Sequence, residues 1–264
     1  MIEYQLKDED GNTFDLNGSS VTVALKNSVT QGEDSFDYDN KIIDRSYLDG
    51  SVVIGSKRLI ARKYVMQITH VNNDSSAYRA IINELLYWLS KTVYIVDVTN
   101  SLELSVVISE INISYDEGAL KLSSDDSFSF IALTPYWSDI AYNELTGTAL
   151  ATTIKTVPIS NSGFLKAFPV ITLTATVATS DVQIYIDGLN AGIQIQDNLF
   201  GTVGYLSMVI DCETGLVTLG ELNINNSIAQ GTGFFYISPG SDQINILSNQ
   251  QITYSIKWKK RYFV

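Results

Sequence analysis

Residues Ser75–Lys91 read SSAYRAIINELLYWLSK, and this stretch decides how the first half of the chain folds. Its apolar side chains recur at the i, i+3, i+4 and i+7 spacing of an α-helix, and they are Tyr78, Ile81, Ile82, Leu85, Leu86 and Leu89. Asp74, Ser75 or Ser76 can cap the amino end, and Lys91 suits the carboxyl end of the helix dipole. A stripe this wide must be buried, so the sequence predicts one amphipathic helix that covers a face of a β-sheet.

Around this helix, apolar and polar residues alternate, which is typical of half-buried strands. In the first half, the alternating stretches are Ser51–Ile60, Ala61–His70, Leu102–Ile108, Ile111–Tyr115 and Phe128–Trp137. Turn sequences such as Asp10-Gly11-Asn12 and Asp49-Gly50 supply the positive φ that tight hairpins need. One helix among antiparallel strands predicts an α+β domain over residues 1–137, ending where Pro135 stops ladder pairing.

Residues 138–156 lose clear periodicity, which predicts a connector. Alternation resumes at Val157 and continues through Pro169–Val177, Asp181–Ile186, Tyr205–Ile210, Leu216–Leu219, Thr232–Ile237, Gln243–Leu247 and Gln251–Trp258. These strands are enough for one antiparallel β-sandwich over residues 157–264. The predicted fold is therefore mainly β with one helix, in two domains.

Composition and charge exclude several classes of protein. The chain of 264 residues has 17 Lys and Arg against 29 Asp and Glu, which gives a net charge of −12. Nucleic-acid binding instead requires clustered Lys and Arg side chains. No apolar run approaches the roughly 18 residues of a membrane span, and MIEYQLKDEDGN lacks the features of a signal peptide. We therefore expect a protein made in the cytoplasm without membrane insertion.

The sequence nominates no catalytic, cofactor or metal site. His70 is the one histidine and ends a strand, and Cys212 is the one cysteine and follows an apolar strand. Asp8-Glu9-Asp10-Gly11-Asn12 resembles the start of a calcium loop but lacks the later glutamate, which favours an ordinary hairpin. Asp125-Asp126 is interpreted as a solvated turn, although a pair of hydrolase carboxylates can meet only in the fold.

The order and spacing of many short motifs resemble those of the distal tail proteins of long-tailed, siphovirus-type bacteriophages. In the first half these motifs are Leu48-Asp49-Gly50 with Arg58, Tyr78-Arg79, Trp88-Leu89 and Pro135-Tyr136-Trp137. In the second half they are Asn161-x-Gly163, Pro169-x-Ile171, Ile210-Asp211 with Gly215-x-Val217, Ser238-Pro239-Gly240 with Ile244, and the terminal ITYSIKWKKRYF.

This resemblance implies a non-enzymatic virion protein with an N-terminal ring-forming domain and a C-terminal galectin-like β-sandwich. Its copies would form a hexameric hub that joins the tail tube to tail-tip or baseplate proteins. DNA would pass through the channel without specific binding, and an acidic bore would repel it. Asp34, Asp37 and Asp39 form the acidic loop that we expect to line this channel.

Two other classes of function stay open on the sequence alone. A β-sandwich in a chain with 15 tyrosines could be a carbohydrate- or receptor-binding module, because tyrosine rings stack on sugars and serve at protein interfaces. A hydrolase would need two carboxylates brought together in a cleft, and no motif identifies them.

Overall fold

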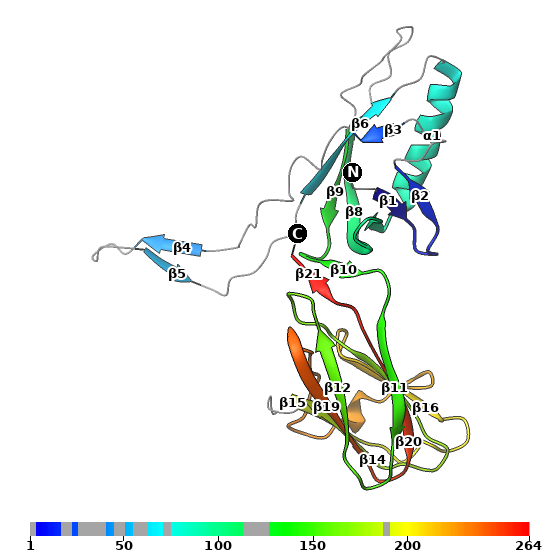
Figure 1. Cartoon of the computed structure of the whole chain (residues 1–264), viewed down its shortest axis with the longest axis vertical. Coiled ribbons are helices and arrows are strands. Elements are labelled where there is room, and N and C mark those ends of the chain that lie inside the picture. Colours follow the sequence, from blue (N-terminus) through cyan, green and yellow to red (C-terminus); the bar gives the residue numbers. More distant parts are fainter. Residues whose placement is uncertain are drawn as a thin grey trace. The chain divides into compact units, whose positions relative to one another are not determined.

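The computed structural model describes residues 4–16, 23–25, 41–44, 51–54, 63–70, 75–112, 127–186 and 191–263. The chain folds into two compact units (Figure 1). The first is Met1–Ile140 with Phe263–Val264, and the second is Ala141–Tyr262. Within the described ranges, none of the helices has the length and apolarity needed to span a membrane.

In its described residues, the N-terminal unit is an antiparallel sheet with one helix. Its elements are β1 (Tyr4–Lys7), β2 (Thr13–Asp15), β3 (Val23–Leu25), β4 (Lys41–Asp44), β5 (Ser51–Ile54), β6 (Lys63–His70), α1 (Ser75–Lys91), β7 (Tyr94–Asp97), β8 (Leu102–Asn112), β9 (Ser127–Ala132) and β10 (Trp137–Asp139). The strand order is β2-β1-β7-β8-β9-β6-β3, with β10 also paired to β8. Strands β4 and β5 pair with each other in a separate hairpin.

Helix α1 lies beside β1 and β2 and spans the residues that the sequence predicts (Figure 1). Ile82, Leu85 and Leu89 of its apolar stripe are fully buried, and Leu85 and Leu89 join the same core as Phe128 and Phe130 of β9. Tyr78 and Ile81 are also in α1, but their side chains lie outside the described part of the structure. The prediction of a helix packed on a β-sheet is confirmed.

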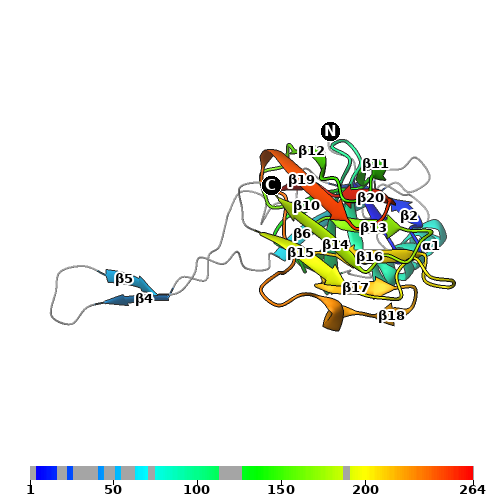
Figure 2. The same ribbon diagram turned by 90° about the horizontal axis from the view of Figure 1, so that it is seen from below.

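The C-terminal unit is an antiparallel β-sandwich, as predicted. Its elements are β11 (Asn143–Ala149), β12 (Lys155–Asn161), β13 (Val170–Thr174), β14 (Asp181–Ile186), β15 (Ala191–Gln196), β16 (Ser207–Asp211), β17 (Leu216–Leu219), β18 (Leu222–Asn223), a 3₁₀ turn η1 (Asn225–Ser227), β19 (Gly240–Ser248), β20 (Ile252–Trp258) and β21 (Arg261–Tyr262). One sheet has the strand order β11-β20-β13-β16-β17-β18, and the other has the order β12-β19-β14-β15. Figure 2 labels the strands of both sheets.

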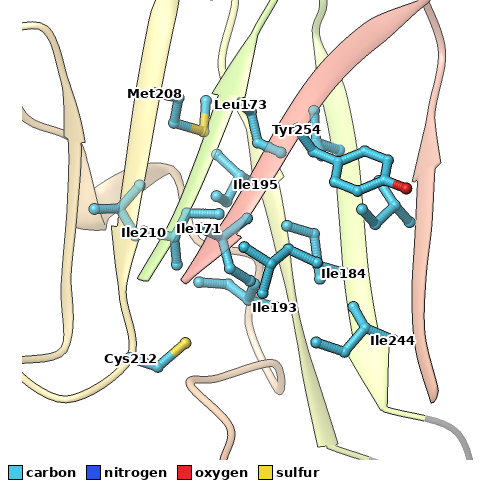
Figure 3. Packing of buried hydrophobic residues seen from close by; sticks show 14 of the residues in the cluster. Ile171, Leu173, Ile184, Ile193, Ile195, Met208, Ile210, Cys212, Ile244 and Tyr254 are labelled. Carbon is cyan, nitrogen blue, oxygen red and sulfur yellow. The ribbon is translucent and has the colours of Figure 1, made fainter. Parts of the chain in front are cut away.

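Branched and long aliphatic side chains fill the space between these two sheets (Figure 3). Ile171 and Leu173 of β13 face Ile184 of β14 and Ile193 of β15, and all four are at most 2% exposed. The alternation of buried and open positions along each strand, for example in β14, produces this core directly from the sequence. Each Å² of apolar surface removed from water stabilises the folded state by about 25 cal/mol, so this core is the main stabilising contribution in the unit.

The predicted connector over residues 138–156 was wrong for much of its length. Residues 143–149 form β11, which pairs with β20 from Asn143–Trp258 to Ala149–Ile252, and β12 begins at Lys155. The sequence signal is weak because Leu145 is the one large apolar residue at the inward positions of β11, and the others are Asn143, Gly147 and Ala149. Gly147 faces the ring of Tyr254, which occupies the space that a larger side chain would need.

Candidate interaction surfaces

The candidate nucleophile and base of the sequence are Cys212 and His70. Cys212 is 4% exposed, and burial raises the pKa of its thiol to about 12, so it stays protonated near neutral pH. His70 ends β6, where its backbone pairs with Val23, and its side chain lies outside the described residues. A protonated, buried thiol cannot act as a nucleophile.

The acidic stretch at the β1–β2 turn forms a hairpin rather than an open ligand cage. The carboxylate of Asp8 accepts hydrogen bonds from the backbone and side-chain nitrogens of Asn12, at 2.8 and 2.9 Å. The side-chain hydrogen bond from Asn12 also lowers the pKa of Asp8. Gly11 takes the φ of +85° that the turn needs. In the parts of the chain that the structure describes, no group of three or more His, Cys, Asp or Glu could hold a metal ion.

Two acidic groups named from the sequence are not among the residues that the structure describes. Asp34, Asp37 and Asp39, the expected channel-lining loop, lie outside the described residues, and so do Asp125 and Asp126.

Asn161 holds together one end of the C-terminal sandwich. It is fully buried, and its amide nitrogen donates to the carbonyl oxygens of Leu165 and Ile237 at 2.9 and 3.2 Å. Its oxygen accepts from the backbone nitrogen of Gly163 at 3.0 Å. A Cβ atom at Gly163 would lie 2.7 Å from the carbonyl oxygen of Arg261, so only glycine fits there. The Asn161-x-Gly163 motif is therefore a packing requirement.

Arg261 meets this loop from the C-terminal strand. Its carbonyl oxygen accepts from the nitrogens of Phe164 and Leu165 at 2.9 and 3.2 Å. Its guanidinium forms an ion pair with Glu213 at 2.5 Å and lies 5.0 Å from the ring centre of Phe168. The basic end of the chain thus has a structural role within its own unit.

The motif Ile210-Asp211 with Gly215-x-Val217 forms the hairpin between β16 and β17. Oδ1 of Asp211 accepts from the nitrogens of Glu213 and Thr214, and Gly215 adopts a φ of +69°. Asn225 completes the turn by accepting from Val217 and donating to Gly215. The second motif is also explained by local backbone geometry.

Three exposed aliphatic side chains gather on one face of the N-terminal sheet, at β8 and β9. Phe128 and Phe130 of β9 point into the core, so Ile131 falls on the other face, opposite Val107 of β8 in the strand register. Val107 is 45% exposed, Ile131 38%, and Leu133, which directly follows β9, 62%. Sequence analysis missed this patch because alternation identifies a second face without showing whether that face is covered.

The outer faces of the two sandwich sheets differ in chemistry. On the six-stranded sheet, one row across the register holds Thr146, Ser255, Thr172, Val209 and Thr218, and these side chains offer no ring for stacking. On the four-stranded sheet, Tyr185 lies between Asn245 and Gly192, with Gln183 and Gln194 in the next row. The single aromatic position among these residues is Tyr185.

Comparisons with known proteins agree with the sequence resemblance. A family model described as siphovirus-type tail component, C-terminal domain, matches residues 162–262, which contain Asn161's partner Gly163 and both turns described above. No curated protein matches the chain. The predicted resemblance to phage distal tail proteins is confirmed.

Two solved structures share the fold over nearly the whole chain. The first is Dit of phage SPP1, described as a paradigm of the hub adsorption apparatus in phages that infect Gram-positive hosts; it has 14% identity and a TM-score of 0.71, with 98% of each chain covered. The second is the phage P2 baseplate in its activated conformation with calcium, with 10% identity, a TM-score of 0.53, and coverage of 97% of this chain and 98% of that chain.

Proposed function

We propose that this chain is a structural hub protein of a long-tailed phage, because residues 162–262 match the family model of the siphovirus-type tail component, C-terminal domain. In this proposal its copies form a ring, hexameric by the resemblance, between the tail tube and the tail-tip or baseplate proteins. The protein would reside in the virion after assembly in the host cytoplasm, and DNA would cross the ring without specific binding.

One combined observation carries this proposal. The C-terminal unit matches a tail-component family model, and both units share the fold of a solved tail hub protein. The fold of SPP1 Dit covers 98% of this chain, so the N-terminal unit is included as well as the matched domain. A fold alone does not assign a function, but a family domain on a shared two-unit fold narrows the choice to tail components.

The open patch of Val107, Ile131 and Leu133 supports a ring built by the N-terminal unit. Exposed aliphatic side chains on one sheet face are what a subunit interface removes from water. Cyclic assembly uses two different surfaces of each subunit, so one such patch suits a head-to-tail contact.

Charge and chemistry are consistent with a passive channel. The chain carries a net −12, and a ring repeats any acidic patch around its axis, which disfavours retention of DNA phosphates. Asp34, Asp37 and Asp39 remain our proposed channel-lining residues. Among the described residues, the one cysteine is buried and protonated, which supports a non-enzymatic role.

The test is the oligomeric state of the full chain. Native mass spectrometry and electron microscopy of the purified protein, alone and with its tail tube protein, should show a closed ring. Ile131→Asp with Leu133→Asp should prevent it, because both charges would fall within the buried contact. Val98→Asp, which alters an exposed apolar residue in the turn after β7, is the matched control. A monomer under both conditions would refute the ring.

Carbohydrate binding by the sandwich is the second candidate, and Tyr185 is the observation that favours it. A half-buried tyrosine ring next to the half-buried amides of Gln183 and Gln194 combines a stacking surface with hydrogen-bonding groups. A glycan array probed with the full chain tests it, with Tyr185→Ala as the loss-of-binding variant. No bound glycan would leave the structural role as the function of this unit.

A further inference from the structure

Four loops gather at one end of the C-terminal sandwich. They connect β11 to β12, β13 to β14, β15 to β16, and β19 to β20, at the lower end of the sandwich in Figure 1. The strand registers fix this end, because Ala149 pairs with Ile252 and Thr174 pairs with both Thr253 and Ser207. The chain enters β11 and leaves β20 at the opposite end, where Asn143 pairs with Trp258.

These loops expose a concentration of aliphatic side chains. Val203 is 98% exposed, and five further residues at this end are between 44% and 60% exposed. The six residues, here called the apolar tip, are Leu150, Ile154, Val177, Leu199, Val203 and Leu206. Isolated exposed leucines need no explanation, but six at one end of one unit mark an interaction surface.

The apolar tip is held in place by hydrogen bonds between two of its loops. The nitrogens of Thr179 and Ala175 donate to the carbonyl oxygens of Phe200 and Leu206 at 2.8 and 3.0 Å. Phe200 itself is fully buried in the sandwich core. At Gly201, φ is +84°, and a Cβ would lie 2.7 Å from the carbonyl carbon of Val177, so the two loops are in contact.

Asp197 fixes the start of the longer loop. Its carboxylate accepts from the nitrogens of Leu199 and Phe200 at 2.7 and 3.3 Å and from the hydroxyl of Ser227 at 3.0 Å. The exposed side chains are therefore presented by ordered backbone. A preorganised apolar surface loses little conformational entropy when it binds.

The chemistry of the tip selects the kind of partner. Loops 150–154, 175–180 and 249–251 contain no charged residue, and loop 197–206 contains only Asp197, at its start. The neighbouring charged residues are Asp181, Glu221 and one basic residue, Lys155. An acidic border disfavours DNA and anionic lipid headgroups. The six aliphatic side chains also lack the flat rings that bind sugars.

We propose that the apolar tip docks a different protein chain that presents an aliphatic surface bordered by basic residues. A second copy of this chain fits less well, because two tips meeting face to face would bring two acidic borders together. The inference rests on the proposed function, since the partner is sought among the proteins assembled with this chain in the phage particle.

The test places a photo-crosslinking amino acid, benzoylphenylalanine, at Val203 of the full chain, where almost complete exposure makes misfolding of the variant negligible. Purified particles are irradiated, and crosslinked peptides are identified by mass spectrometry. The matched control carries the same group at Leu216, an exposed apolar residue at the other end of the sandwich. We expect the Val203 probe to attach to one different protein, near Lys or Arg residues, and the Leu216 probe to leave that protein unlabelled.

Two outcomes overturn the inference while leaving the proposed function intact. In the first, the particles contain the chain, but the Val203 probe gives no more crosslinking than the Leu216 control. In the second, the Val203 probe attaches to another copy of this chain. Absence of the chain from particles overturns both proposals.

The acidic border is tested with the crosslinked protein as the ligand. Val203→Lys should weaken its binding more than Val203→Asp, because lysine would oppose a basic border. Equal weakening, or stronger weakening by aspartate, would refute the proposed charge of the partner.

Discussion

The amide nitrogen of Asn161 lies 3.2 Å from the carbonyl oxygen of Ile237, and this buried hydrogen bond joins residues 76 positions apart. Through the same side chain, the end of β12 is tied to the loop at Gly163 and Leu165. One polar residue therefore organises an end of the sandwich that the apolar core alone does not fix.

Asn161→Ala should lower the free energy of unfolding by about 2–4 kcal/mol, because three buried backbone groups lose their partner. Chemical denaturation of the full chain measures the loss in the transition of the C-terminal unit. Asn226→Ala changes an exposed asparagine and is the control. A loss no larger than that of the control would show that water replaces the amide.

Asn161→Asp should be destabilising in a pH-dependent manner. Its carboxylate would face two carbonyl oxygens in a buried site, so its pKa in the folded state would exceed that in the unfolded state. Stability of the variant is then greatest below the unfolded pKa and falls as pH rises through the folded pKa. Denaturation at about pH 4, close to the ordinary pKa of Asp, and at about pH 7, well above it, measures this difference. A variant that gains stability with pH, relative to the unaltered chain, would contradict it.

Leu85→Asp should unfold the N-terminal unit, because Leu85 is fully buried between α1 and the sheet. Loss of the aliphatic side chain alone costs about 2–5 kcal/mol, and the buried charge adds to this. Asn83→Asp places the same charge on the exposed side of α1 and should be nearly neutral. Calorimetry should show loss of one transition and retention of the transition of the sandwich; loss of both would mean that the units unfold together.

Cys212 should be unreactive toward thiol reagents until the sandwich unfolds. Burial raises the pKa of its thiol from 9.0 to about 12, so the folded state retains a proton that the unfolded state releases. The contribution of this protonated thiol to the free energy of unfolding is fully present below pH 9.0. It is lost between pH 9.0 and about pH 12, at about 1.4 kcal/mol per pH unit. Cys212→Ala lacks this contribution, and its stability should fall less steeply over that range. Rapid labelling of the native protein at pH 8 would contradict the burial.

The fragment Ala141–Tyr262 should fold alone and melt cooperatively, because it contains every strand of both sandwich sheets. A fragment that starts at Val157 lacks β11, which exposes the edge of β20 and removes the buried side chain of Ala149. We expect this shorter fragment to melt at lower temperature and to aggregate. Equal melting temperatures would show that β11 contributes nothing to the sandwich.

Periodicity alone predicted the elements whose inward positions are large and apolar. Helix α1 and strands such as β14 belong to this class. Strand β11 was missed because Gly147 and Ala149 carry little apolar surface, and Thr232–Ile237, predicted as a strand, makes only an isolated bridge at Ile237. Strand order was not predicted, because pairing across long sequence separations leaves no local signal.

The candidate surfaces were less predictable than the fold. Asn161 and Gly163 were recognised as a motif, but their reason, a buried amide and a close approach to Arg261, is tertiary. Val203 reads as an ordinary apolar residue, and its significance comes from exposure on an ordered loop. Sequence patterns indicate which side chains are apolar, whereas the fold decides which of them stay uncovered.

The two strands that close the sandwich, β19 and β20, are synthesised after every other strand of its two sheets. Strand β20 lies between β11 and β13, and β19 lies between β12 and β14, so these two consecutive strands supply one interior strand to each sheet. A ribosome must therefore release the chain through β20 before both sheets are complete, and until then β11 and β12 lack their partner strands. Folding of this unit should be slow and should follow the synthesis of β20, and nascent chains truncated before residue 240 should depend on chaperones to stay soluble.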